Sequence, residues 1–134
     1  MPMQHIQIEL HDSTVISVEV NDERACLDME VVIHSNKGKS PNSHSIFTQS
    51  AIFKIGHCRI LNNLHEFPLW ILDGTITIDN ESFDNMVPIS FHRTGAVVLS
   101  FSGAEGTLRI VGDSVNLELQ DEPQYLEEFQ DDNA

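Results

Sequence analysis

Basic residues are scarce in this chain. Lys and Arg together number 7 among 134 residues, against 21 Asp and Glu, so the formal net charge is −14 with His neutral. Proteins bind nucleic-acid phosphates and anionic bilayers through Lys and Arg. The composition therefore argues against a nucleic-acid partner and against a membrane surface. It favours a basic protein as the partner, because complementary charge speeds association.

Export signals, long apolar runs and paired cysteines are also missing. Residues 1–10 contain neither the basic segment nor the apolar segment of a signal peptide. No apolar run approaches the roughly 18 residues of a membrane-spanning helix. The two cysteines, Cys26 and Cys58, fit no CxxC pattern. We therefore expect a cytoplasmic protein whose two thiols are free.

Polar and apolar residues alternate along most of the chain, which is the period of a half-buried β-strand. The alternation runs through residues 5–11, 14–20 and 27–33, and these segments predict three strands joined by short turns, one of them at Asp12-Ser13. Further strands are predicted over residues 46–60, with a break near Gly56, and over 70–78, 87–91, 96–101, 107–111 and 115–120, with a hairpin turn at Gly112-Asp113. These eight or nine strands predict an all-β fold, either an antiparallel β-sandwich or a partly closed barrel.

The end of the chain has a different pattern. Residues 1–120 are expected to form a single all-β domain, and residues 121–134 an acidic C-terminal helix and tail with six acids and no base. Asp121 or Glu122 can cap a short helix, and Pro123 suits its first turn. The apolar residues of that helix, Tyr125, Leu126 and Phe129, would share one face.

The triplet His11-Asp12-Ser13 holds the three side-chain types of a hydrolase triad. Triad residues normally come from separate parts of a fold, however, and no GxSxG motif lifts a serine from a tight turn. Asp and Ser after a strand are good turn formers. We therefore predict no catalytic residue and a protein that is not an enzyme, with His11 and Asp12 kept as candidate binding residues.

The seven histidines raise the question of a metal site. Zinc ligands commonly come in pairs such as HxxxH or CxxC, and neither spacing occurs here. No calcium-binding loop and no glycine-rich phosphate loop is present either. The sequence therefore predicts no metal and no cofactor.

Four further residues are candidates for binding. Trp70 follows Pro68 by two positions, and the other three lie in the acidic tail. Trp70 ends the segment Phe67-Pro68-Leu69-Trp70, which can form an apolar interface patch at a sheet edge. Tyr125, Glu127 and Glu128 combine an aromatic ring with adjacent negative charges. Aromatic residues with complementary charge are typical of protein interfaces.

The opening segment resembles the start of several small uncharacterised bacterial all-β families. The resemblance rests on Leu10-His11-Asp12-Ser13, followed by alternating strands over residues 14–20 and 25–33, and covers about the first 35 residues. Some of these families are immunity proteins of toxin–immunity systems. The resemblance implies a cytosolic, acidic protein that acts by binding, with an acidic surface that occupies a basic site on its partner. It implies no catalytic residue.

Two functions stay open. One is a non-catalytic acidic protein-binding module of bacterial type, including an immunity-type inhibitor of a basic toxin. The alternative is a small-ligand-binding protein or enzyme with a His/Asp-containing pocket, formed if His11, Asp12, His57 and His92 converge. A homodimer through edge strands is also compatible with the pattern, with residues 96–101 and 107–111 as candidate edges.

Overall fold

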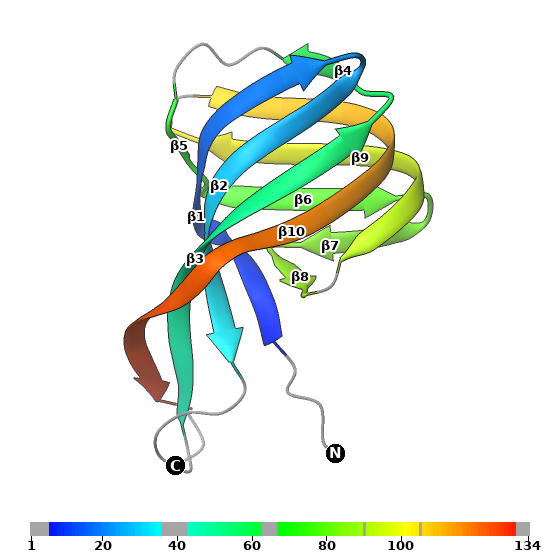
Figure 1. Ribbon diagram of the computed structural model, residues 1–134. Coiled ribbons are helices and arrows are strands. Elements are labelled where there is room, and N and C mark those ends of the chain that lie inside the picture. The colour runs from blue at the N-terminus through cyan, green and yellow to red at the C-terminus, as the bar shows by residue number, and fades with distance from the viewer. Residues whose placement is uncertain (1–5, 36–42, 63–66, 90, 105, 131–134) are drawn as a thin grey trace.

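The computed structural model describes residues 6–35, 43–62, 67–89, 91–104 and 106–130, and these form ten β-strands (Figure 1). The strands are β1 (Ile6–Asn21), β2 (Arg24–Ser35), β3 (Ser43–Gly56), β4 (Arg59–Asn62), β5 (Leu69–Trp70), β6 (Asp73–Ile78), β7 (Glu81–Asp84), β8 (Met86–Pro88), β9 (His92–Gly103) and β10 (Gly106–Gln130). No helix is present among these residues, so none there could cross a membrane. The all-β prediction is confirmed.

All ten strands belong to one antiparallel sheet, in the order β5-β1-β2-β3-β10-β9-β6-β7, with β4 paired to β10 and β8 paired to β1. The sheet curves strongly around its core and is not closed (Figure 1). The long strand β10 pairs with β9 over its first part and with β3 over its second. It therefore joins the meander β1–β2–β3 to the strands β9, β6 and β7.

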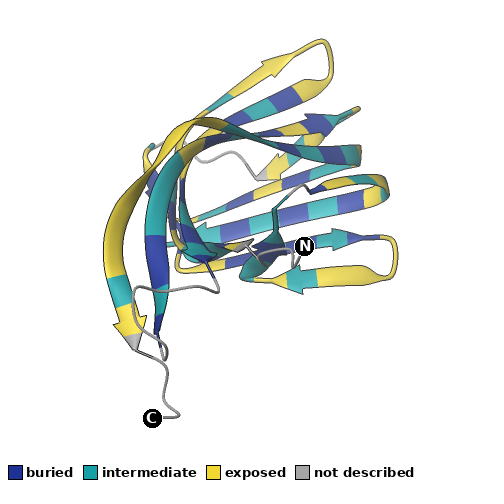
Figure 2. Cartoon of the chain, turned by 60° about the horizontal axis from the view of Figure 1, so that its bottom comes forward, coloured by how far each residue is buried: buried dark blue, intermediate teal, exposed yellow. Residues whose placement is uncertain are grey.

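The core lies on the inner face of this curved sheet. Buried and exposed residues alternate along β2 and β6, as a sheet with one solvated face requires (Figure 2). The rings of Phe53 on β3 and Phe101 on β9 meet edge to face, with their centroids 6.3 Å apart. Both rings are fully buried, and together they connect the two halves of the sheet.

The predicted turn at Asp12-Ser13 is wrong, because β1 runs through it as one strand with a β-bulge. The pairing register of β1 against β2 shifts between Glu9 and Thr14, and Asp12 adopts a left-handed backbone with φ of 74°. The Ser13 side chain is buried; its Oγ donates to the Glu9 carbonyl (2.5 Å) and accepts from the Val32 amide (3.0 Å). A serine hydroxyl thus supplies the hydrogen bonds that the bulge removes from the ladder.

The predicted C-terminal helix is also wrong. Residues 121–130 continue β10, and Glu128 and Phe129 pair with Ser45 and His44 of β3. The physical reason is that a lone short helix is marginal in water, whereas the start of β3 offers a long row of backbone partners. The boundary expected at residue 120 falls inside this strand.

Several shorter segments also differ from the expected structure. The expected hairpin at Gly112-Asp113 is a register shift within β10. Residues 70–78 divide into β5 and β6, which helps to bring the total to ten strands. The candidate edge 96–101 is covered, because it lies between β6 and β10; of the candidate edge 107–111, residues 109–111 lie between β9 and β4.

Candidate functional site

The sheet extends into a narrow arm, which we call the projecting end: residues 43–48 of β3 and 121–130 of β10, with the end of β2 paired along residues 46–48 of β3 (Figure 1). Residues 121–127 and Phe129 are exposed, and Figure 2 shows this stretch as the longest exposed part of β10. Three of them are large apolar side chains. Tyr125 is 45% exposed, Leu126 56% and Phe129 52%.

One face of the projecting end is organised around Glu128. The hydroxyl of Ser45 donates to both oxygens of its carboxylate (3.2 and 3.0 Å), and that of Ser43 donates to Oε1 (3.1 Å). The Tyr125 hydroxyl donates to Oε2 at 2.9 Å, and its ring meets Phe47 edge to face. The hydrogen bond to this carboxylate raises the pKa of Tyr125 above its ordinary value of 10.0. Glu128 therefore positions Tyr125, and Glu127 stays exposed.

The other face carries a row of histidines that the sequence did not place together. His34 Nε2 lies 2.5 Å from Glu9 Oε1, and His34 Nδ1 lies 2.9 Å from His44 Nε2. The His44 ring in turn contacts Phe129, with the ring centroids 5.1 Å apart. This row crosses from β1 through β2 and β3 to β10, so it links the first strand to the projecting end.

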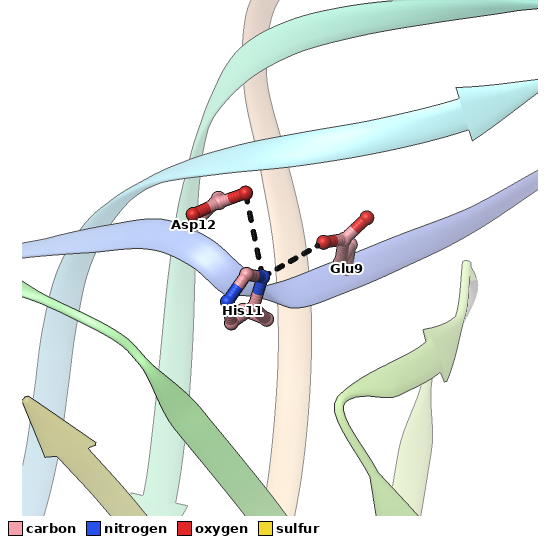
Figure 3. A group of neighbouring side chains, drawn as sticks. All are labelled: Glu9, His11 and Asp12. Atoms are coloured by element: carbon pink, nitrogen blue, oxygen red, sulfur yellow. Dashed lines mark hydrogen bonds and ion pairs between the residues drawn. The ribbon is translucent and has the colours of Figure 1, made fainter. Parts of the chain in front are cut away.

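The row continues on β1 into a cluster of three side chains, Glu9, His11 and Asp12 (Figure 3). His11 Nδ1 lies 3.2 Å from Glu9 Oε2 and 3.3 Å from Asp12 Oδ2. One potential ligand atom from each residue lies within 4.8 Å of the other two. The two predicted binding residues His11 and Asp12 are therefore adjacent in space, and Glu9 is the partner that sequence reasoning missed.

Trp70 lies next to this cluster rather than at the projecting end. It pairs with Thr14 on β1 and is 58% exposed. The following residue, Ile71, accepts a hydrogen bond from the Asp12 amide and donates one to the Ser13 carbonyl. The predicted binding residues thus fall in two groups: His11, Asp12 and Trp70 at the bulge, and Tyr125, Glu127 and Glu128 at the projecting end.

An open hollow of about 970 Å³ lies elsewhere on the molecule. Its lining includes Arg24, Lys54 and a pair formed by His57 and Asp113, whose Nδ1 and Oδ2 are 2.6 Å apart. His92 instead bonds to Asn116. In the part of the chain that is described, His11 and Asp12 do not join His57 and His92, so the expected common pocket is not formed.

The two cysteines, Cys26 and Cys58, are free thiols, as the sequence predicts. Burial raises the pKa of the Cys58 thiol above its ordinary value. A raised pKa keeps a thiol protonated and unreactive at neutral pH. Cys58 is therefore a poor candidate for a nucleophile.

Comparison of this chain with family models, with curated proteins and with solved structures finds no match.

Proposed function

We propose that this chain is a non-catalytic, acidic protein-binding module that takes a basic segment of another protein at its projecting end. The main support for this proposal is the pairing of β10, which leaves one edge of this strand without a described neighbour. Pairing of β10 with β9 ends at Asn116, and among the described residues no strand pairs with that edge over residues 118–130. An edge strand can pair with a strand from another chain.

The side chains beside this edge favour a particular partner. Tyr125, Leu126 and Phe129 provide apolar and aromatic contact area, which is typical of the energetic centre of an interface. The exposed acidic residues of the projecting end are Asp121, Glu122 and Glu127. An extended segment in which Lys or Arg alternates with apolar residues would match both the edge and its charge.

Inhibition of a basic toxin is the biological use that we propose for this binding. The formal charge of −14 and the resemblance of Leu10-His11-Asp12-Ser13 to immunity-type families support it. An acidic module laid over a cationic active site would exclude that site's anionic substrate. No group of this chain needs to act on a substrate in such a role.

The experiment is affinity capture from the native cell, followed by calorimetry with the purified partner at low and high salt. We expect a basic partner whose affinity falls steeply with salt and is lost in Leu126→Lys. The matched control is Ile16→Lys, since Ile16 is a similarly exposed apolar residue (47%) on β1, which β2 and β3 separate from β10 in the sheet. A partner bound equally by both variants would refute the assigned surface. Recovery of the chain alone, with light scattering indicating a dimer, would refute the hetero-partner.

A second candidate is a small-ligand-binding protein or enzyme that uses the hollow. The observation that favours it is the placement of Arg24, Lys54 and the His57–Asp113 pair around one open space. A thermal-shift screen with inorganic phosphate and small carboxylic acids tests it. A rise in melting temperature that Lys54→Ala abolishes would support this candidate, and no shift with any compound would remove it.

A further inference from the structure

We propose that Glu9, His11 and Asp12 form a binding site for a divalent transition-metal ion of the zinc class at the bulge of β1 (Figure 3). The site does not depend on the protein-binding function. All three residues come from four consecutive positions, 9–12, of strand β1.

The spacing of the ligand atoms fits one ion. Zinc binds imidazole nitrogen and carboxylate oxygen at about 2.0–2.2 Å, so two ligands at a tetrahedral angle lie about 3.4 Å apart. His11 Nδ1 lies 3.2 Å from Glu9 Oε2 and 3.3 Å from Asp12 Oδ2. Both distances match this expectation, and both begin at the same nitrogen atom.

The bulge is what brings the three groups together. In a regular strand His11 and Asp12 would point to opposite faces of the sheet. The left-handed backbone of Asp12 turns its carboxylate toward His11, and the buried flanking residues Leu10 and Ser13 hold the bulge in place. The ligands therefore project from a fixed segment of backbone rather than from a loop.

Charge also favours a cation here. Two carboxylates converge on one imidazole nitrogen, which can offer only one proton or one lone pair. Within the described residues, the ion-pair partners of Glu9 and Asp12 are histidines and include no Lys or Arg. A divalent ion at this point would balance the two carboxylates and use the lone pair of His11.

A second layer of groups orients Glu9. His34 Nε2 contacts Glu9 Oε1, which leaves Oε2 for the ion, and His44 contacts the other nitrogen of His34. Ligating carboxylates are commonly held by outer hydrogen bonds of this kind. His34 is therefore a positioning residue of the proposed site.

The ligand set selects the class of metal. One imidazole with two carboxylates and no thiolate suits Zn²⁺, Ni²⁺ or Co²⁺ better than Mg²⁺ or Ca²⁺, which prefer oxygen alone. His11 is 45% exposed and Asp12 46%, so the remaining coordination position faces solvent. Three protein ligands with one open position are typical of sites where the metal exchanges ligands.

The test is a calorimetric titration of the untagged, EDTA-treated full chain with Zn²⁺, repeated with Mg²⁺. We expect one Zn²⁺ per chain, weak or no binding of Mg²⁺, and visible absorption of Co²⁺ typical of low coordination number. Asp12→Asn and His11→Ala should each weaken Zn²⁺ binding at least about 100-fold. Asn is chosen because it tolerates the left-handed backbone while it removes the charge.

The matched control is His57→Ala, which removes an exposed histidine that pairs with only one carboxylate. It should leave Zn²⁺ affinity unchanged, and His34→Gln should weaken it by about 10–100-fold, as for other outer-layer groups. Unaltered thermal melting of the metal-free variants would verify that each one folds. No saturable Zn²⁺ binding, or binding that survives Asp12→Asn and His11→Ala, would overturn the proposal.

Discussion

Replacement of Ser13 by Ala gives the sharpest test of how the bulge is held. The Ser13 hydroxyl donates to the Glu9 carbonyl and accepts from the Val32 amide, and the side chain is fully buried. Alanine would leave one carbonyl and one amide without their partner in a place that water does not reach. Each such group costs about 1–3 kcal/mol, so we expect the free energy of unfolding to fall by about 2–6 kcal/mol.

The assay is urea unfolding followed by the fluorescence of Trp70, the single tryptophan of the chain. With a denaturant slope of about 2 kcal/mol per molar, the loss corresponds to a midpoint about 1–3 M lower. Ser17→Ala on the same strand is the control, because Ser17 is exposed, and it should change stability by less than about 0.5 kcal/mol. Equal midpoints for the two variants would refute the assigned role of Ser13.

Three further outcomes are expected. Glu128→Gln should lower the pKa of Tyr125, the only tyrosine, toward 10.0 in a spectrophotometric titration. Because the pKa of Tyr125 is raised in the folded protein, the stabilisation from its hydrogen bond to Glu128 is fully present below pH 10.0. This stabilisation is lost as the pH rises through the raised pKa. Gly103→Ala should destabilise the fold by about 3 kcal/mol in thermal melting, since a β-carbon there would lie 2.4 Å from the Trp70 carbonyl oxygen. Cys58 should react slowly with a thiol reagent at neutral pH and faster on urea unfolding, because burial raises its pKa; equal rates in both states would contradict this.

The elements that the sequence predicts well are those specified by neighbouring residues. The alternation in residues 27–33 is the burial pattern of β2. The break near Gly56 is likewise the end of β3. In each case the polar–apolar period or a turn residue acts within a few positions of the chain.

The elements that the sequence misses depend on distant partners. Ser13 looks like a turn residue because its hydrogen-bond partner Val32 is 19 positions away. Residues 121–130 have the local signals of a helix start, but the strand that pairs with them begins at Ser43. The histidine row has the same cause, since Glu9, His34 and His44 meet only once the strand register is set.

The central position of β10 has a consequence for the order of events during synthesis. The strands that precede it form two groups, one containing β1, β2 and β3 and the other β6, β7 and β9, and β10 lies between β3 and β9 in the sheet. A ribosome adds roughly 5–20 residues per second, so for several seconds the emerging chain carries β3 with one edge unpaired. Residues 106–130 then insert and join both groups at once. A nascent chain halted before this point would leave this edge of β3 open to strands from other chains.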